Sequence, residues 1–217
     1  MYLIILRFRW LFFCILSISL FVSTPSYAQN KSKTKAQSSQ KLNSFLSPKQ
    51  QMGLHTEDLR NWMLSLYLQY PDELAKSTQV GASEMVEWVF EGKNNWKFEA
   101  LRSQQGQDAL ALWFDENYLG DRILALVVGF ESMLFKAYGA ENEYAIPQVV
   151  SEQGLMTTVC DLRQWQYRLL NQQPENQTQS TNSFLNNPSF KEGLDSVVMT
   201  ITHRIESNVS SKVVCGQ

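Results

Sequence analysis

The residue with the strongest chemical signature in this sequence is Glu131, an acid in the middle of a long apolar stretch. The segment from Asp121 to Gly139 is long enough for about five helical turns, and residues 123–130 carry no polar side chain. On a helix, the positions three, four and seven residues from Glu131 are all apolar or aromatic. Because a carboxyl group in an apolar pocket acquires a raised pKa, it is suited to act as a general acid. Glu131 is therefore the candidate catalytic residue of this chain.

Two short fragments resemble the signature of the soluble lytic transglycosylases. Glu131-Ser132 resembles the pair that supplies the catalytic acid in that family, and Gly-Leu-Met at 154–156 resembles a segment that lines its glycan cleft. The resemblance implies that Glu131 protonates a glycosidic oxygen of peptidoglycan. However, Thr157 stands where the family has Gln, and no third motif of the Ala-Tyr-Asn-Ala-Gly type follows. We therefore treat this activity as the alternative to a non-enzymatic binding or accessory role.

The sequence lacks the motifs of metal sites, nucleophilic active sites and phosphate-binding loops. The chain has two histidines, and neither His55 nor His203 belongs to a motif with metal-ligand spacing. There is also no Gly-x-Ser-x-Gly nucleophile motif and no Gly-rich phosphate loop. We therefore expect no metal and no cofactor, and we expect His203 to be solvated on the polar face of the last helix.

Arg163 is a second charged residue at a position where an apolar one is expected, in a helix predicted over residues 152–172. Arg163 falls among apolar positions of its helix, as Glu131 does in the preceding one. A short connector makes the two helices antiparallel neighbours, and buried charges usually persist only when they are paired. We therefore predict a buried Glu131–Arg163 ion pair. In the alternative, Arg163 reaches water, and Glu131 is protonated or meets another donor.

The first 28 residues have the pattern of a secretory signal peptide. Basic residues precede an apolar run at 10–22, and small residues lead to a cleavage site between Ala28 and Gln29. The run is shorter than the roughly 20 residues that cross a bilayer. We expect cleavage at this site and export to the periplasm or medium of a bacterium, with contact to the membrane only through this segment.

Cys160 and Cys215 are the cysteines that remain after this cleavage. In an oxidising compartment, an even pair predicts a disulfide rather than two free thiols. The bridge would tie the end of the chain to its middle.

The charge of the chain argues against nucleic acid as a partner. Lys and Arg number 19 against 21 Asp and Glu, so no basic excess is available to neutralise phosphates. We expect instead an envelope protein or a small apolar ligand as the partner. Aromatic residues at helical spacing are more often core residues than binding residues. This expectation applies to Trp62, Trp88, Trp96, Trp113 and Trp165.

The elements that position these residues are helical. Residues 29–53 are rich in Lys, Ser and Gln and are predicted to form a disordered spacer, because they cannot bury enough apolar surface. Residues 54–217 are predicted to form one helical domain, with order beginning at Thr56 as an N-cap. Asp121 and Gly139 bound a central apolar helix over about 121–138.

Two further helix starts and one ambiguous stretch complete the pattern. Ser151 is predicted to cap the helix at 152–172, and Asn187 with Pro188 is predicted to start the last helix. The alternation of apolar residues near 86–100 fits a short β-hairpin as well as a helix that Ser83 caps. We favour the helix, because a lone hairpin is marginally stable.

The sequence thus predicts an all-α, single-domain bundle around the central helix. The order of apolar and acidic residues from Asp121 to Leu169 resembles that of secreted bacterial helical proteins with no assigned activity. The resemblance implies an envelope location and no particular reaction.

Overall fold

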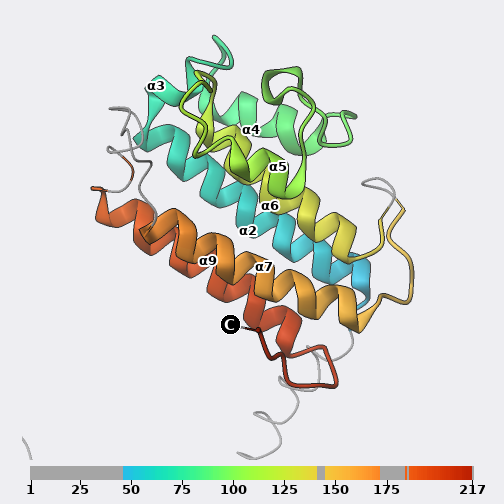
Figure 1. Ribbon diagram of the computed structural model, residues 1–217. Coiled ribbons are helices and arrows are strands. Elements are labelled where there is room, and N and C mark those ends of the chain that lie inside the picture. The colour runs from blue at the N-terminus through green and yellow to red at the C-terminus, as the bar shows by residue number, and fades with distance from the viewer. Residues whose placement is uncertain (1–45, 141–144, 172–183, 185, 217) are drawn as a thin grey trace, which may run out of the picture. The chain divides into compact units, whose positions relative to one another are not determined.

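A computed structural model describes residues 46–140, 145–171, 184 and 186–216 (Figure 1). Helices joined by turns account for these residues, and the described part of the chain contains no strand. The helices are α2 (Pro48–Gln69), α3 (Pro71–Leu74), α4 (Ala82–Glu91), the 3₁₀ helix η1 (Glu99–Leu101), α5 (Gly106–Ala111), α6 (Arg122–Ala137), α7 (Glu152–Asn171) and α9 (Pro188–Glu206). The predicted all-α class is confirmed.

Helix α6 is the central element, as its apolar run predicted. It packs against α2, α3, α5 and α7, while α9 packs against α2 and α7 (Figure 1). Asp121 caps α6 by accepting a hydrogen bond from the N–H of Leu124 at 2.9 Å. Gly139 follows the helix with a φ of 69°, a left-handed conformation that costs glycine little. Both end signals read from the sequence are therefore the ones that the structure uses.

The start of α6 is fixed by buried hydrogen bonds from neighbouring segments. The fully buried Asp121 carboxylate accepts from the hydroxyl of Tyr67 at 2.7 Å and from that of Ser77 at 2.8 Å. Burial raises the pKa of Asp121 to about 6, and these hydrogen bonds partly offset that effect. Glu73 accepts from the N–H of Arg122 at 3.0 Å. These contacts tie the N-terminus of α6 to α2 and α3.

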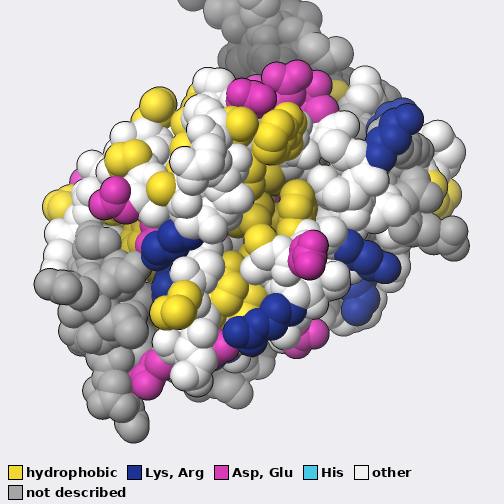
Figure 2. Space-filling model, turned by 90° about the horizontal axis from the view of Figure 1, so that it is seen from above, with side chains coloured by type: hydrophobic (Ala, Val, Ile, Leu, Met, Phe, Trp, Pro, Cys, Tyr) yellow, Lys and Arg dark blue, Asp and Glu magenta, His cyan; other side chains and the backbone are white. Residues whose placement is uncertain are grey.

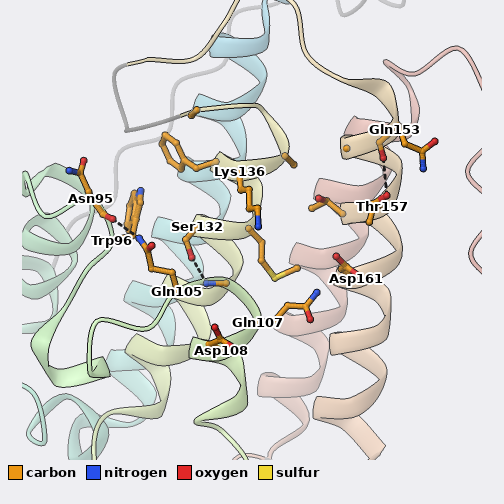
Figure 3. A pocket seen from close by; sticks show the side chains of 17 residues that line it. Asn95, Trp96, Gln105, Gln107, Asp108, Ser132, Lys136, Gln153, Thr157 and Asp161 are labelled. Atoms are coloured by element: carbon orange, nitrogen blue, oxygen red, sulfur yellow. Dashed lines mark hydrogen bonds between the residues drawn. The ribbon is translucent and has the colours of Figure 1, made fainter.

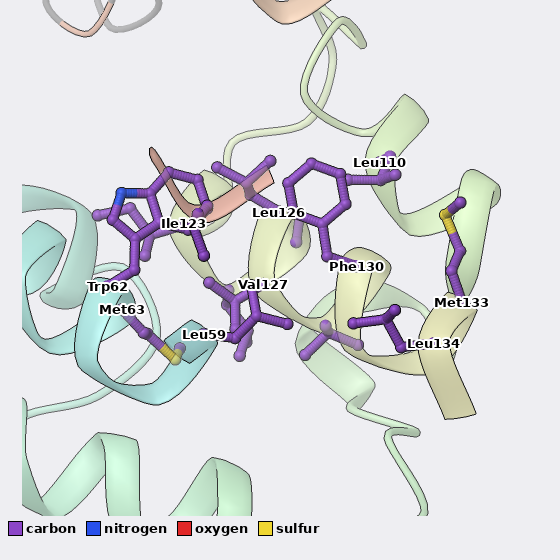
Figure 4. Close-up of a cluster of buried hydrophobic side chains, with 14 of the residues drawn as sticks. Leu59, Trp62, Met63, Leu110, Ile123, Leu126, Val127, Phe130, Met133 and Leu134 are labelled. Carbon is purple, nitrogen blue, oxygen red and sulfur yellow. The ribbon is translucent and has the colours of Figure 1, made fainter. Parts of the chain in front are cut away.

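Aliphatic and aromatic side chains together fill the core between α6 and its neighbours (Figure 4). Trp62 of α2 stacks on Phe130 of α6, with ring centroids 6.4 Å apart and 26° between the planes. Trp113 lies almost parallel to Phe190 of α9, at 5.4 Å and 13°. Such pairs contribute about 1 kcal/mol each beyond their buried area. The buried tryptophans are Trp62, Trp96, Trp113 and Trp165, whereas Trp88 is 51% exposed.

Helix α2 begins earlier than the sequence analysis predicted. Its N-cap is Ser47 rather than Thr56, Ser47 and Gln50 form a reciprocal capping box, and Pro48 is the first residue of the helix. Residues 48–53 are therefore helical, although we had assigned them to the disordered spacer. The added turns bury Met52 and extend the apolar stripe of α2. This cap was missed in the sequence analysis because the lysine-rich composition around Ser47 indicated disorder.

The ambiguous stretch near 86–100 is helical in its first part. Helix α4 starts after Gly81, two residues before the expected cap Ser83, and it ends before Gly92. No described residue of 86–100 forms a strand, so the hairpin alternative does not occur there. The chain reverses instead through Asn95 and Trp96, which adopt positive φ angles of 48° and 61°.

Helices α7 and α9 start where their caps predicted, and a disulfide joins α7 to the end of the chain. The hydroxyl of Ser151 accepts from the N–H of Gly154 at 3.2 Å, and Asn187 caps α9. Cys160 and Cys215 are bonded, with their Cα atoms 5.4 Å apart and a sequence separation of 55. Closing a loop of this length contributes about 4 kcal/mol in the chain-entropy model. The predicted bridge is confirmed.

Some sequence predictions fall outside the described residues. These are the signal segment 1–28, its cleavage site between Ala28 and Gln29, and the spacer up to residue 45. Among the described helices, none combines the length and apolar character needed to cross a membrane.

Candidate functional site

Glu131 lies in the core and not in a cleft. Its side chain is fully buried, and its Oε1 accepts a hydrogen bond from the hydroxyl of Thr56 on α2 at 2.5 Å. The other oxygen, Oε2, has no hydrogen-bond partner among the described residues. Burial raises the pKa of Glu131 to about 8, and the bond from Thr56 partly offsets this. The raised pKa was expected, but the access that a general acid needs is missing.

The predicted Glu131–Arg163 ion pair is not formed. Arg163 is exposed and pairs instead with Glu206 near the end of α9, with nitrogen and oxygen 2.9 Å apart. Helix α7 turns Leu162 and Trp165 toward the core, which leaves Arg163 beside α9. The sequence correctly placed Glu131 among apolar neighbours, but it could not show that α9 lies next to α7.

The two transglycosylase-like fragments are not assembled into one site. Ser132 follows Glu131 directly, yet its hydroxyl accepts from the N–H of Gly106 at 2.7 Å and donates to a carbonyl of α6. Ser132 thus fixes α5 on the side of α6 away from α2. Gly154 lies near Ser132 along a surface cavity, but Glu131 does not line that cavity. Adjacent residues of a helix point about 100° apart, which separates the acid from the cleft.

The principal cavity, which we call the α5–α7 cleft, lies where α5, the C-terminal half of α6 and the first half of α7 meet (Figure 3). Its volume is about 760 Å³, within the roughly 300–1,000 Å³ of small-molecule sites. Its lining residues are Asn95, Trp96, Gln105, Gly106, Gln107, Asp108, Ser132, Met133, Phe135, Lys136, Ala137, Ala140, Gln153, Gly154, Thr157, Thr158 and Asp161.

A close approach of α5 to α6 shapes one wall of this cleft. A Cβ atom on Gly129 would lie 2.5 Å from Cγ of Leu110, so only glycine lets the two helices come this near. Gly106, at the start of α5, has a φ of 55°. Its N–H bond to Ser132 holds that start against α6. These local features carry Gln107 and Asp108 to the edge of the cleft.

Charged side chains from three helices face the cleft without intramolecular partners. Lys136 comes from α6, Asp108 from α5 and Asp161 from α7, and Figure 3 shows Lys136 between the two flanking helices. Within the described residues, none of the three forms an ion pair. Lone charges in a concavity lose part of their hydration without gaining a counter-charge. The cleft therefore offers one cation and two carboxylates to a ligand.

Side-chain amides supply further free donors and acceptors. The amide groups of Asn95, Gln107 and Gln153 make no hydrogen bond within the described part of the chain, whereas Gln105 donates to the carbonyl of Asn95 at 2.6 Å. Each free amide has both a donor and an acceptor. The set is therefore suited to a ligand that itself carries both kinds of group.

Trp96 is the most strained and least satisfied residue of the cleft. It is 5% exposed, and its indole N–H has no hydrogen-bond partner among the described residues. Both Asn95 and Trp96 are left-handed, held by a bond from the Trp96 N–H to Oδ1 of Asn94 at 2.8 Å. Non-glycine residues in this conformation cost of order 1 kcal/mol or more and gather at functional sites. Backbone strain and an indole N–H without an acceptor thus occur in the same residue, Trp96, at one wall of the cleft.

Trp96 also separates the cleft from a second cavity. Its ring packs 5.6 Å from Phe90 and 5.6 Å from Phe135, measured between centroids. The second cavity has a volume of about 400 Å³ and a largely apolar lining that includes Met52 and Ile146. Trp96 and Phe135 line both spaces. In the sequence, Trp96 belongs to the apolar alternation near 86–100, which does not show that it lies between two cavities.

A buried histidine network lies at another place in the bundle. Nδ1 of His55 lies 2.8 Å from the guanidinium of Arg204, and Nε2 lies 2.9 Å from the hydroxyl of Tyr138. Because arginine only donates, Nδ1 is the acceptor, so Nε2 carries the proton and donates to Tyr138. Tyr138 then donates to Gln51 at 3.3 Å, and Arg204 also pairs with Asp58 at 2.7 Å. The partners of His55 are all internal, which indicates a structural role.

Burial sets the protonation state of that histidine. It lowers the pKa of His55 to about 3, and the positive charge of Arg204 acts in the same direction. The sequence analysis missed this network, although His55 sits three residues after Met52 and four before Leu59 on the buried stripe of α2. The expectation for His203 is confirmed, since its side chain is exposed.

The described residues give little support for a metal site or for a basic surface that binds nucleic acid. No group of three or more His, Cys, Asp or Glu side chains in the described residues is placed to hold a metal ion. On the face shown in Figure 2, Lys and Arg side chains are scattered among acidic ones and form no continuous basic patch. The α5–α7 cleft is therefore the best candidate for function.

Comparisons of the chain with protein-family models, with curated proteins and with solved structures find no match.

Proposed function

We propose that this chain is an exported bacterial envelope protein that binds a small ligand in the α5–α7 cleft and catalyses no reaction. The observation that carries the proposal is the set of unpartnered groups around one cavity. Lys136, Asp108 and Asp161 lack counter-charges among the described residues, and the buried indole N–H of Trp96 lacks an acceptor. Charged side chains that line a cavity and have no internal counter-charge are free to pair with a charged ligand.

The lining of the cleft modifies the ligand expected from the sequence. From the sequence we had expected an envelope protein or a small apolar ligand as the partner, and the amide, hydroxyl and charged side chains of this lining add polar groups for a ligand to bind. Apolar atoms, including those of Met133 and Phe135, nevertheless supply the larger share of the lining surface. Polar groups fix the orientation of a ligand, and apolar contacts contribute burial. The proposed ligand therefore combines polar groups with an apolar portion.

The lytic transglycosylase alternative has less support. A glycosidic acid must lie within hydrogen-bond reach of the bond that it cleaves. Glu131 is fully buried between α2 and α6, and it lines neither of the two cavities described above. Of the carboxylates that do face the cleft, Asp108 is exposed and Asp161 is half-buried, and neither is held in an apolar pocket as Glu131 is.

Filling the cleft should abolish ligand binding without unfolding the protein. Thr157 is exposed on the α7 wall, so Thr157→Trp adds bulk inside the cleft and leaves the core intact. The protein is incubated with the low-molecular-weight fraction of a bacterial periplasmic extract, and native mass spectrometry detects bound species. We expect an adduct with the wild type and none with Thr157→Trp.

The matched control is Thr200→Trp, which adds the same bulk on the exposed side of α9, outside both cavities. Thr200→Trp should still bind the ligand and show the same adduct as the wild type. Equal adducts in all three proteins, or no adduct in the wild type, would contradict binding in this cleft.

Export predicts a defined mature mass. The N-terminal pattern that ends at Ala28 and the bridge between Cys160 and Cys215 both support an oxidising compartment. Intact-mass spectrometry of the protein from the envelope fraction should give a chain that begins at Gln29. The mass should also be two hydrogens below that of the reduced form. A chain that retains Met1, or one with two free thiols, would show that the export proposal is wrong.

A further inference from the structure

We propose that the ligand of the α5–α7 cleft is a short peptide with a free amino terminus and a free carboxyl terminus. This inference rests on the proposed binding function and names the ligand class of the same site. Lys136 binds the terminal carboxylate, Asp108 and Asp161 bind the terminal ammonium, and the free side-chain amides bind the peptide groups between them.

The charges of the cleft favour a ligand with both signs. One cation on α6 and one carboxylate on each flanking helix face the same space, and none has a counter-charge among the described residues. A purely anionic ligand would satisfy Lys136 but would be repelled by Asp108 and Asp161. A polycation would meet the opposite conflict at Lys136. A zwitterion gives every charge a partner.

The uncharged lining favours peptide groups. A peptide group has one N–H donor and one C=O acceptor, which matches the side-chain amides of Asn95, Gln107 and Gln153. Met133 and Phe135 are placed to contact an apolar side chain of the peptide. The volume of about 760 Å³ suits a chain of a few residues.

The burial of Trp96 argues against a neutral saccharide. Sugars bind proteins by laying the C–H face of a ring on an exposed aromatic face. Trp96 is 5% exposed and its two neighbours, Phe90 and Phe135, already cover its ring, so it has no open face to offer. A neutral sugar would also leave Lys136 and Asp161 without counter-charges.

The test compares peptide libraries that differ only at their ends. The exported protein, with its disulfide intact, is titrated with a mixed-sequence tetrapeptide library in native mass spectrometry. The same library is used after amidation of its carboxyl ends or after acetylation of its amino ends, and chitotetraose serves as the neutral saccharide probe. We expect the free library to bind and each blocked library to bind about tenfold more weakly, because a charge-assisted hydrogen bond is lost.

Variants assign each end of the peptide to its side chain. In Lys136→Gln, amidation should no longer weaken binding, and in Asp161→Asn acetylation should weaken it less than in the wild type. Lys191→Gln, on the exposed side of α9 and outside the cleft, should keep the wild-type ratios. Lys136 and Lys191 are exposed and Asp161 is half-buried outside the core, so loss of folding does not confuse the comparison.

Two results would overturn the peptide assignment. The first is equal binding of free and blocked libraries, and the second is binding of chitotetraose with no binding of any tetrapeptide. If Thr157→Trp still removes an adduct from the periplasmic extract while no tetrapeptide binds, the binding function stands and the peptide assignment is wrong.

Discussion

As the pH rises from 4.5 to about 8, Glu131 should remove roughly 5 kcal/mol from the free energy of unfolding. The folded protein holds a proton on Glu131 with a pKa of about 8, whereas the unfolded chain releases it near 4.5. The favourable contribution is therefore complete below pH 4.5 and is lost as the pH passes through 8. The cause is burial, since the carboxylate has one hydrogen bond, from Thr56.

The substitution Glu131→Gln isolates this effect, because glutamine has a similar shape and does not titrate. The pKa of Asp121 is also raised, from 3.8 to about 6, so the interval above pH 6 belongs mainly to Glu131. Urea denaturation at about pH 6 and about pH 8 should show a loss of stability in the wild type that is absent from Glu131→Gln.

The control for this experiment is Glu87→Gln, which removes an exposed acid of α4. It should retain the full loss between the two pH values. If Glu131→Gln loses as much stability as the wild type, the carboxyl group is not the buried proton acceptor that we describe.

On the acid side, His55 should remove roughly 5 kcal/mol from the free energy of unfolding as the pH falls from 6.5 to about 3. Here the unfolded chain binds the proton near pH 6.5, and the folded chain resists it until about pH 3. The contribution of neutral His55 is therefore present above pH 6.5 and is lost as the pH falls through 3. Nδ1 cannot accept a proton and the Arg204 bond at once, which adds to the cost of burying the charge.

The variant His55→Gln should flatten the acid limb of the stability curve, because a side-chain amide also offers one acceptor and one donor but does not titrate. The absolute stability falls in this variant, since the amide fills the ring site less well, so the slope against pH is the quantity to compare. His203→Gln removes the exposed histidine and should keep the wild-type slope. An unchanged slope in His55→Gln would contradict the burial of a neutral imidazole.

Local signals in the sequence determined where most helices start and stop. Asp121, Ser151 and Asn187 are capping residues in the structure, and Gly139 closes α6. Such signals act within one turn of a helix, so the neighbouring residues are enough to recognise them. The start of α2 was missed because Ser47 lies at the edge of a polar, lysine-rich stretch, where composition had indicated disorder.

The sequence also determined that certain residues are buried, but not what they meet, and its prediction of a buried Arg163 is wrong. Hydrophobic periodicity placed Glu131 in the interior, and an even number of cysteines predicted the bridge. The partner of Glu131 is Thr56, and that of Arg163 is Glu206, and both come from helices distant in the chain. Periodicity fixes the side of a helix that faces inward, whereas a partner depends on the rotation and order of the helices around it.

The α5–α7 cleft was decided by the tertiary structure alone. Its walls come from three segments, at residues 95–108, 132–140 and 153–161. Lys136, Asp108 and Asp161 look like ordinary solvated charges in the sequence, because each lies on the polar side of its own helix. They become a candidate binding site only when α5 and α7 both pack against α6 around one cavity. That packing is set by contacts distant in sequence, such as Gly129 against Leu110, which no local pattern contains.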